Sequence, residues 1–450
     1  MNREYDVVVL GTGNAGMAAA DAARSAGRTV LMVECRDEVG GTCPLRGCVP
    51  KKVLVAAAEV METIEGAGEH SIVVGGARMD WAGLIARERS LIAGTSGSFI
   101  KSLKERDIEL LHGHARFTGR NEIEVDGRRV AAGKIVIATG SMARPLPFEG
   151  SEHLIDNEDI LNDRALPNSV VFIGGGVIAL EFAHVYARAG AQVSILEVSS
   201  RILPSADADA ASRLCLATEK AGITVLTGIE VEAVVREDSG FTVRFSKEGE
   251  QRSLSADRVA HGAGRIPAVE ALDLDAAGIE HDGPKIEVTS HLASVSNGDV
   301  YVAGDALAGS AQLSPLASHE GEVVGRNIVE GNVAVPDYRP IPQVVFAVPA
   351  LASVGLTEEA AEDEGVAVDV EEHDMSNWLS AKLYGGETAY AKVLVDKGSR
   401  RIVGAHLIGK RAEEVIHLFA FAMKFGVTAD QMSAFVYAFP TFSSDVKSLV

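Results

Sequence analysis

Runs of apolar residues separated by a glycine-rich turn predict a strand–helix–strand unit at the start of the chain. Residues 5–10, YDVVVL, form a short apolar run, and the turn GTGNAG follows at 11–16. An alanine-rich stretch then extends to Gly27, and a second apolar run, TVLMVE, occupies 29–34. This order is typical of a parallel βαβ unit.

The same order returns much later in the chain. Residues 169–197 read SVVFIGGGVIALEFAHVYARAGAQVSILE, which again predicts strand, glycine turn, helix and strand. Each copy ends in an acidic residue, Glu34 in the first and Glu197 in the second. A repeat at this large spacing indicates two similar nucleotide-binding modules rather than a solenoid.

The remaining apolar segments predict the rest of the architecture. Shorter strands are expected within 134–141 and 297–306, whereas strand-like and helix-like segments alternate beyond roughly residue 337. We therefore predict an α/β fold with two Rossmann-like domains and an α+β C-terminal domain. The expected boundaries divide the chain into four segments: 1–148, 149–266, 267–336 and 337–450.

Composition and charge exclude several kinds of partner. The formal net charge of −21 at pH 7 opposes binding to phosphate backbones and to anionic membrane surfaces. We therefore expect a small-molecule substrate, with no nucleic acid and no membrane as a partner. The N-terminal sequence MNREYDVVVL shows no features of a signal peptide, and a cytoplasmic location is expected.

The glycine motifs predict how each module would hold a dinucleotide. Gly11, Gly13 and Gly16 form G-x-G-x-x-G, which permits a tight turn, close approach of a pyrophosphate, and tight packing of helix on strand. The pyrophosphate would lie at the helix N-terminus, where free N–H groups favour negative charge. Glu34 would then bind a ribose hydroxyl.

The second module carries the same motif with one accepted variation. Its positions are Gly174, Gly176 and Ala179, followed by Glu197 at the end of the second strand. A carboxylate there accepts hydrogen bonds from the 2′-hydroxyl of NAD and repels the 2′-phosphate of NADP. Arg201 lies just beyond and would offset part of that repulsion, so NAD is favoured over NADP.

A pair of cysteines lies in a polar, turn-like stretch. The chain has four cysteines, too few for a disulfide-stapled scaffold, and Cys43 and Cys48 are separated by only four residues in GGTCPLRGCVPKK. Structural zinc would need further ligands at knuckle spacing, which are absent from the sequence. Redox or nucleophilic use is favoured over a buried structural pair, whereas Cys35 and Cys215 are expected to be small, buried hydrophobic side chains.

Cations surround this cysteine pair in the sequence. We expect Arg46, Lys51 and Lys52 to lower the thiol pKa values and favour the thiolate. For Arg46 two roles stay open, one in which it faces solvent and one in which it recruits an anionic substrate or stabilises a thiolate.

The stretch GGTCPLRGCVPKK resembles the GGTCxxxGCxPxK signature of the flavoprotein disulfide reductases. This family of pyridine nucleotide-disulfide oxidoreductases includes glutathione reductase, lipoamide dehydrogenase and mercuric reductase. Further motifs, spread over essentially the whole chain, are similar to motifs of this family: GTGNAG, IVIATGS, GGGVIALE, GAGRIP, VYVAGDA and the segment at 346–360.

The resemblance implies cofactors, domain roles and a homodimer. The segments 1–148 and 267–336 would form the FAD-binding domain, 149–266 the NAD(P)-binding domain, and 337–450 the dimerisation domain. FAD and NAD(H) would be the cofactors, with NADP(H) less favoured. The additional residues implied in cofactor binding are Gly41, Thr42, Lys52, Ala138, Thr139, Gly140, Glu181, Gly264, Arg265, Gly304 and Asp305.

The resemblance also implies a redox-active centre. Electrons would pass from NADH through the flavin to the Cys43–Cys48 disulfide, and then to a disulfide or another soft electrophile. Cys48 would be the flavin-proximal, charge-transfer thiol, and Cys43 the interchange thiol. Glu181 would pair with a lysine beside the flavin, Lys52.

The C-terminal sequence departs from the family pattern. The family has His-Pro-Thr with a glutamate five residues after the histidine, whereas this chain has Phe439 and Ser444 at those positions. Phenylalanine cannot transfer a proton, so the acid–base pair is missing unless Tyr437 or Asp445 replaces it.

This departure keeps several functions open. A phenylalanine at that position is similar to 2-ketopropyl-coenzyme M oxidoreductase/carboxylase, which implies C–S cleavage and carboxylation as an alternative to disulfide reduction. Mercuric reductase is less favoured because the chain has no cysteine pair near its C-terminus. A redox sensor that binds FAD without turnover is a further alternative.

Overall fold

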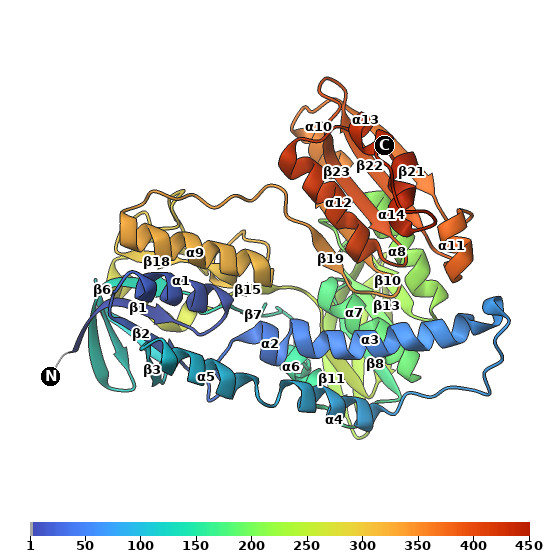
Figure 1. Cartoon of the computed structure of the whole chain (residues 1–450). Coiled ribbons are helices and arrows are strands. Elements are labelled where there is room, and N and C mark those ends of the chain that lie inside the picture. Colours follow the sequence, from blue (N-terminus) through green and yellow to red (C-terminus); the bar gives the residue numbers. More distant parts are fainter. Residues whose placement is uncertain (1–2) are drawn as a thin grey trace. The chain divides into compact units, whose positions relative to one another are not determined.

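The computed structural model describes residues 3–450 (Figure 1). Residues 1 and 2, which belong to the N-terminal stretch considered above for a signal peptide, lie outside the described residues. The chain divides into two compact units. The first comprises Met1–Pro50, Arg87–Arg144 and Arg265–Asp337, and the second comprises Lys51–Ala86, Pro145–Gly264 and Tyr338–Val450.

The first unit is built on a mixed sheet in the order β3-β2-β1-β6-β5-β4, with β18 paired to β6. Strands β1, β2, β3, β6 and β18 run parallel, whereas β4 and β5 are antiparallel additions. The strand bounds are β1 Arg3–Leu10, β2 Val30–Glu34, β3 Glu109–His112, β4 Ala115–Gly119, β5 Glu122–Val125, β6 Arg128–Ile137 and β18 Val300–Val302. The central strands are apolar and almost completely buried, as expected for strands covered on both faces.

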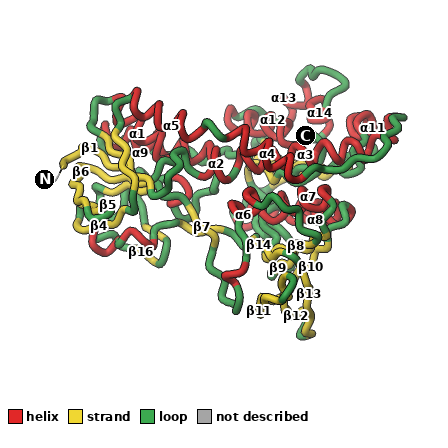
Figure 2. Tube along the Cα trace, turned by 90° about the horizontal axis from the view of Figure 1, so that it is seen from below, coloured by secondary structure: helices red, strands yellow, loops and turns green. Residues whose placement is uncertain are grey.

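Helices α1 (Asn14–Ser25) and α9 (Ser314–Glu330) contact each other beside this sheet (Figure 2). A Cβ at Gly321 of α9 would lie 2.2 Å from the carbonyl oxygen of Ala15, so the two helices approach backbone to backbone. The unit also contains α5 (Thr95–Glu105) and small sheets formed by β7 with β15 and by β16 with β17. These strands are β7 Ser141–Ala143, β15 Arg265–Pro267, β16 His281–Asp282 and β17 Lys285–Ile286.

The second unit contains a parallel sheet in the order β10-β9-β8-β14. Its strands are β8 Ser169–Ile173, β9 Gln192–Glu197, β10 Thr224–Thr227 and β14 Arg258–His261, and its helices are α7 Val177–Ala189 and α8 Ala208–Lys220. A three-stranded antiparallel sheet follows, made of β11 Ile229–Glu237, β12 Gly240–Lys247 and β13 Glu250–Ala256. Three further helices lie outside these sheets: α3 Cys48–Glu65, which begins in the first unit, α4 Trp81–Ile92, which ends in it, and α6 Asn157–Asn162.

The C-terminal part of the second unit is a five-stranded antiparallel sheet in the order β19-β20-β23-β22-β21. Helix α12 (Ala412–Phe425) contacts β20 and β23 with its buried apolar face. The strands are β19 Gln343–Val345, β20 Leu351–Gly355, β21 Val368–Asp374, β22 Tyr390–Asp396 and β23 Ile402–Ile408. The other helices are α10 Glu358–Asp363, α11 Leu379–Tyr384, α13 Ala429–Ala434 and α14 Phe442–Asp445.

This architecture confirms the predicted fold class, with two strand–helix–strand modules and an α+β C-terminal part. The four predicted domain segments stay a prediction. Within residues 3–450, no helix is both long enough and apolar enough to cross a bilayer.

Candidate active site

The cysteine stretch folds into two consecutive helices. Cys43 lies in the short helix α2 (Thr42–Arg46), and Cys48 is the first residue of the 18-residue helix α3. A helix N-terminus favours negative charge, so the position of Cys48 suits a thiolate. Before α2, a Cβ at Gly41 would lie 2.4 Å from the Cα of Gly13, which is why the loop can pack on the first glycine motif.

Of the other two cysteines, Cys215 is half-buried and Cys35 is exposed, so the expectation of a buried side chain is wrong for Cys35.

Cys43 and Cys48 are adjacent within the first unit. The Cys43 side chain is hydrogen-bonded to Cys48 and to Ser314, and the Cys48 Sγ lies 3.8 Å from the Ser314 Oγ. The Cys48 hydrogen bond, followed by burial, raises the pKa of Cys43 well above its ordinary value. The raised pKa of Cys43 disfavours a thiolate at Cys43, whereas the N-terminus of α3 favours one at Cys48.

The expectation that nearby cations lower the thiol pKa is therefore wrong for Cys43. Each cation is bound to a carboxylate instead. Arg46 contacts Glu38 at 3.3 Å with a side chain only 11% exposed, so the proposal that it faces solvent is also wrong.

The two lysines of α3 have different partners from those predicted. Glu181, on α7, forms its ion pair with Lys51, whereas Lys52 binds Glu59 at 2.8 Å and lies over the Phe346 ring. The predicted Lys52–Glu181 pair is thus wrong. Adjacent helical residues point about 100° apart, so only one of the two lysines can face α7, and that lysine is Lys51.

Glu181 is almost fully buried and doubly bound. Its side chain is 1% exposed, and its Oε1 accepts a hydrogen bond from the Phe346 backbone N–H at 2.8 Å. A buried carboxylate is tolerated when it is paired and hydrogen-bonded. Lys51 and Glu181 therefore form an integral part of the second unit.

The first module has the features that FAD requires. A Cβ at Gly16 would lie 2.2 Å from the Gly11 carbonyl oxygen, so α1 begins directly on the turn and presents its N-terminus. The Glu34 carboxylate is fixed at the end of β2 by the Thr12 hydroxyl at 2.5 Å and the Thr12 N–H at 3.1 Å. The Thr139 Oγ1 is buried and has no hydrogen-bond partner among residues 3–450, as expected for a group that meets a ligand.

Asp305 belongs to a small polar network of the same unit. The Ser141 hydroxyl donates to Asp305 Oδ2 at 3.0 Å, and Arg265 Nε donates to the Ser141 Oγ at 3.0 Å. Burial raises the pKa of Asp305. An acceptor in this position suits the polyol chain of FAD, which the family resemblance implied.

The first unit brings together most of the predicted FAD contacts. Its members are Gly11, Gly13, Gly16, Glu34, Gly41, Thr42, Cys43, Cys48, Ala138, Thr139, Gly140, Arg265, Gly304 and Asp305. The second unit holds the remaining predicted residues: Lys52, Gly174, Gly176, Ala179, Glu181, Glu197, Gly264, Phe439 and Ser444.

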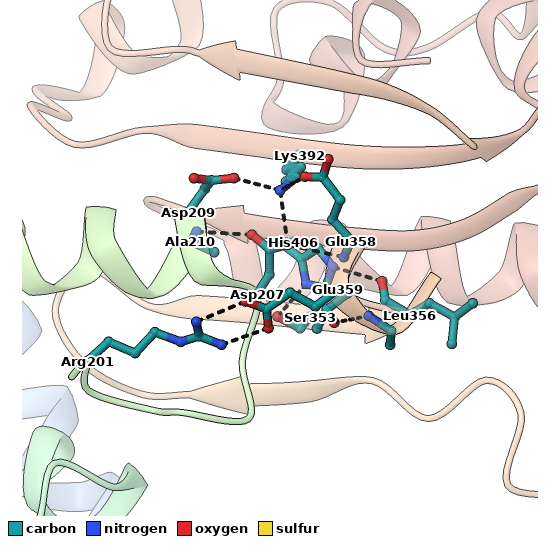
Figure 3. Close-up of polar contacts among 12 residues, drawn as sticks. Arg201, Asp207, Asp209, Ala210, Ser353, Leu356, Glu358, Glu359, Lys392 and His406 are labelled. Carbon is teal, nitrogen blue, oxygen red and sulfur yellow. Dashed lines mark hydrogen bonds and ion pairs between the residues drawn. The ribbon is translucent and has the colours of Figure 1, made fainter. Parts of the chain in front are cut away.

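The second module has the features that a nicotinamide dinucleotide requires. Glu197 ends β9, and its carboxylate accepts hydrogen bonds from the Gly175 N–H at 2.5 Å and the Ser199 N–H at 2.8 Å. These bonds fix a buried anion beside the N-terminus of α7. Arg201 does not offset this charge, because Glu359 binds its guanidinium through two hydrogen bonds of 2.9 and 2.8 Å (Figure 3). This arrangement favours NAD(H).

A network around the buried Lys392 lies next in the same unit, and it was not predicted. Lys392 of β22 is 2% exposed and binds Asp207 at 3.2 Å, Asp209 at 2.6 Å and Glu358 (Figure 3). Asp207 also caps α8 by accepting from the Ala210 N–H. Lys392 and Glu358 lie more than 150 residues beyond Asp207 in sequence, so local patterns carry no signal for the network.

The C-terminal segment offers no free acid–base group at the predicted positions. The Phe439 side chain is 76% exposed, and the Ser444 hydroxyl donates to the Thr441 carbonyl at 2.6 Å. The Tyr437 hydroxyl donates to the Met432 carbonyl at 3.1 Å. Asp445 accepts a hydrogen bond from the Ser380 hydroxyl.

Two histidines, His406 and His319, are engaged in hydrogen bonds elsewhere. His406 is buried, contacts Ser353 Oγ at 3.1 Å and the Leu356 carbonyl at 3.0 Å, and has a pKa lowered by burial. The Nε2 of His319 accepts from the Asp337 N–H.

Ser314 is the polar contact of the thiols that sequence reasoning missed. It is the first residue of α9 and is followed by Pro315, a pattern that signals a helix start but not a contact with cysteines 266 and more residues away.

Comparison with known proteins shows the family of this chain. The family model described as pyridine nucleotide-disulphide oxidoreductase matches residues 5–321, and the model of its dimerisation domain matches residues 341–450. The match to the dimerisation domain supports a homodimer.

Curated relatives extend over nearly the whole chain. The dihydrolipoyl dehydrogenase of Chlorobaculum tepidum is 33% identical over 453 residues, which cover 99% of this chain and 96% of that protein. The dihydrolipoyl dehydrogenase of Thermus scotoductus is 34% identical over 448 residues, which cover 98% and 95%.

Solved structures show the same architecture. The HOCl-induced flavoprotein disulfide reductase RclA from Escherichia coli superposes with a TM-score of 0.87 at 26% identity over 99% of each chain. Its Cu(II) complex gives a TM-score of 0.88 at 25% identity, covering 100% of this chain and 99% of that chain. This chain therefore belongs to the pyridine nucleotide-disulphide oxidoreductases and is an enzyme that uses FAD and NAD(H) as cofactors.

Proposed function

We propose that this enzyme uses NADH to reduce a disulfide, or another soft electrophile, through Cys43 and Cys48. The observation that carries the proposal is the hydrogen-bonded thiol pair at the junction of α2 and α3. The first glycine motif lies in the same unit and packs against the loop that precedes α2. Bound FAD supplies the two-electron transfer from NADH that keeps such a pair in the dithiol state.

The thiol chemistry follows from the position of the proton. The position of Cys48 at the N-terminus of α3, together with the raised pKa of Cys43, favours a thiolate at Cys48 in the reduced pair. A proton must therefore move from Cys43 to Cys48 before Cys43 can attack. The Cys43 thiolate then bonds to one sulfur of the substrate and releases the other as a thiolate. Cys48 then gives its proton to the first released thiolate and attacks the Cys43 sulfur of the mixed disulfide. This attack releases the second thiolate and forms the Cys43–Cys48 disulfide, so the substrate gains the two electrons that the pair loses.

The homodimer is part of the proposal. We propose that the segment Phe439–Asp445 reaches the cysteines of a second copy and completes the substrate cleft there. The exposed Phe439 side chain of this segment suits a contact between copies.

The cytoplasmic location expected from the sequence stays a prediction.

A second candidate is C–S cleavage and carboxylation with the same dithiol as nucleophile. It is favoured by one observation, that the titratable side chains Tyr437 and Asp445 are both hydrogen-bonded within the C-terminal part of the second unit. A site without a proton donor would protect a carbanion long enough for it to react with CO2.

One screen separates the two candidates. NADH oxidation is measured with lipoamide, glutathione disulfide, thioether ketones, Hg(II) and Cu(II), the last because a solved neighbour is described as a Cu(II) complex. We expect wild type to turn over a disulfide substrate at rates of about 1 s⁻¹ or more, and the Cys43→Ser variant not to do so.

The Phe439→His variant is run in parallel. If wild type turns over only thioether ketones with CO2, and Phe439→His gains disulfide reduction by about a hundredfold, the second candidate is correct. If no acceptor supports NADH oxidation in wild type, both candidates fail and a sensor without turnover takes their place.

A further inference from the structure

A serine from a distant helix contacts both thiols. The Ser314 Oγ lies 3.8 Å from the Cys48 Sγ, and the Ser314 side chain is also hydrogen-bonded to Cys43. Ser314 comes from α9, 266 residues beyond Cys48 in the sequence, and all three residues belong to the first unit. A hydroxyl both donates and accepts, so one group can serve two sulfur atoms at once.

The first glycine motif fixes the position of Ser314. The Asn14 amide of GTGNAG donates to the Ser314 carbonyl at 3.3 Å and to the Ser318 Oγ at 3.4 Å. The Ser318 hydroxyl, one turn further along α9, also donates to the Ser314 carbonyl at 3.3 Å. The contact between α1 and α9 therefore holds the backbone of Ser314 and leaves its hydroxyl to the thiols.

The charges around the pair give this hydroxyl an electrostatic role. Asp305 acts on the Cys43 thiol by raising its pKa, whereas the Ser314 hydrogen bond lowers it. Arg46, on α2 between the cysteines, binds Glu38. Among the described groups that act on Cys43, Ser314 is thus a neutral donor that favours the charged form of the pair.

We infer that the Ser314 hydroxyl stabilises the thiolate of the reduced pair and relays its proton between Cys43 and Cys48. In the relay, Oγ accepts the proton of Cys43 and gives its own proton to the Cys48 thiolate. Cys43 becomes the thiolate and Cys48 the thiol, the serine is regenerated, and no electrons move. This inference rests on the proposed function and gives the chain an internal proton path for the step in which Phe439 cannot take part.

The test is a titration of the thiols in reduced, FAD-loaded enzyme. The rate of alkylation by iodoacetamide is measured against pH, and mass spectrometry of the peptides assigns the label to Cys43 or Cys48. Hydrogen bonds to charged groups contribute enough free energy that Ser314→Ala should raise the apparent pKa of the pair by about one unit. Ser314→Thr, which keeps the hydroxyl, should restore the wild-type value.

A matched control comes from the same helix. Ser318→Ala removes a hydroxyl one turn away that bonds the Ser314 backbone rather than sulfur. The Asn14 amide still holds that backbone, so the titration should shift much less than in Ser314→Ala. FAD content and the unfolding midpoint show that each variant is folded. An Ala variant that titrates like wild type, or a Ser318→Ala variant that shifts as much, overturns the inference.

Turnover separates this inference from the proposed function. With a disulfide substrate near neutral pH, Ser314→Ala should lose about tenfold in kcat, because a lost proton path costs rate at the interchange step. A shifted titration in an enzyme that reduces no disulfide would support the role of Ser314 and contradict the proposed function. Normal disulfide turnover with an unshifted titration would do the opposite.

Discussion

The cysteine loop at 42–48 and the C-terminal segment at 437–445 each contain a short helix, α2 and α14, yet they use their polar groups in opposite ways. In the loop at 42–48, the thiols contact each other and a hydroxyl from distant α9. In the segment at 437–445, the polar side chains bond nearby backbone or another helix of the same C-terminal part, and Phe439 is left exposed.

This difference separates a reactive site from a contact surface. Groups that are held by distant elements can be placed against a substrate, whereas groups that satisfy their own turn mainly define its shape. We therefore assign the chemistry to the loop and the shaping of the substrate cleft to the segment. The predictions below test this division in order of expected effect.

The largest effect is expected from removing the interchange thiol. Cys43→Ser should lower kcat for disulfide reduction by at least about a thousandfold, because the nucleophile is lost. Steady-state NADH oxidation with the substrate found in the screen measures it. Cys215→Ser, at a half-buried thiol of α8, is the control and should keep both activity and FAD. Equal losses of activity in the two variants would contradict the assignment of Cys43 as the nucleophile.

The next effect concerns the two lysines that follow the loop on α3. Lys51→Met leaves the buried Glu181 carboxylate without its cation and should lower the free energy of unfolding by about 2–3 kcal/mol. Lys52→Met removes an exposed pair with Glu59 and should cost about 0.5 kcal/mol. Urea unfolding of the FAD-loaded enzyme compares them, and a larger loss in Lys52→Met would reverse our assignment of the pair.

A smaller effect is expected in the C-terminal segment. Thr441 caps α14 by accepting the Ser444 N–H at 3.1 Å, so Thr441→Ala should destabilise this segment by about 1 kcal/mol. Hydrogen exchange of the amides at 442–445 should quicken while the amides of α2 stay unchanged. Faster exchange in α2 would show that the two regions are not independent.

The smallest effect is a pH dependence at Asp445. Burial raises the pKa of Asp445 in the folded chain, so its stabilising contribution is complete below about pH 4, the ordinary aspartate value, and is lost as pH rises through the folded value. Asp445→Asn removes this titration. The stability of the variant relative to wild type should therefore increase as pH rises from about 4 through the folded pKa of Asp445. A constant difference in the free energy of unfolding by urea between acidic and neutral pH would contradict the assignment.

Local sequence patterns predicted most of the fold and much of the site. Strand, turn, helix and terminal acid occur together in each module, so residues 11–16 and 174–179 could be placed correctly without a structure. The pairing of Cys43 with Cys48 could be predicted because the two thiols lie close together in sequence. What these patterns lack is the direction of each side chain, which is why Lys52 was chosen over Lys51 as the partner of Glu181.

Features that depend on distant contacts could not be predicted. Ser314 reaches the thiols only because α9 packs on α1, and Lys392 meets Asp207 across 185 residues. The pKa of Cys43 was misjudged for the same reason. Arg46, which is close to Cys43 in sequence, is bound to Glu38 in the folded chain. The group that acts most strongly on the Cys43 thiol is the thiol of Cys48, which raises its pKa.

The assignment of Cys48 as the charged thiol is tested most directly by the absorbance of the two-electron-reduced enzyme. A long-wavelength charge-transfer band between a thiolate and oxidised FAD should be present in two-electron-reduced wild type, where the dithiol pair holds the electrons. It should also be present in Cys43→Ser before reduction, because this variant cannot form the disulfide and its FAD is oxidised, and it should be absent in Cys48→Ser in either state. A band that survives in Cys48→Ser, or that disappears in Cys43→Ser alone, would contradict the placement of the negative charge on Cys48.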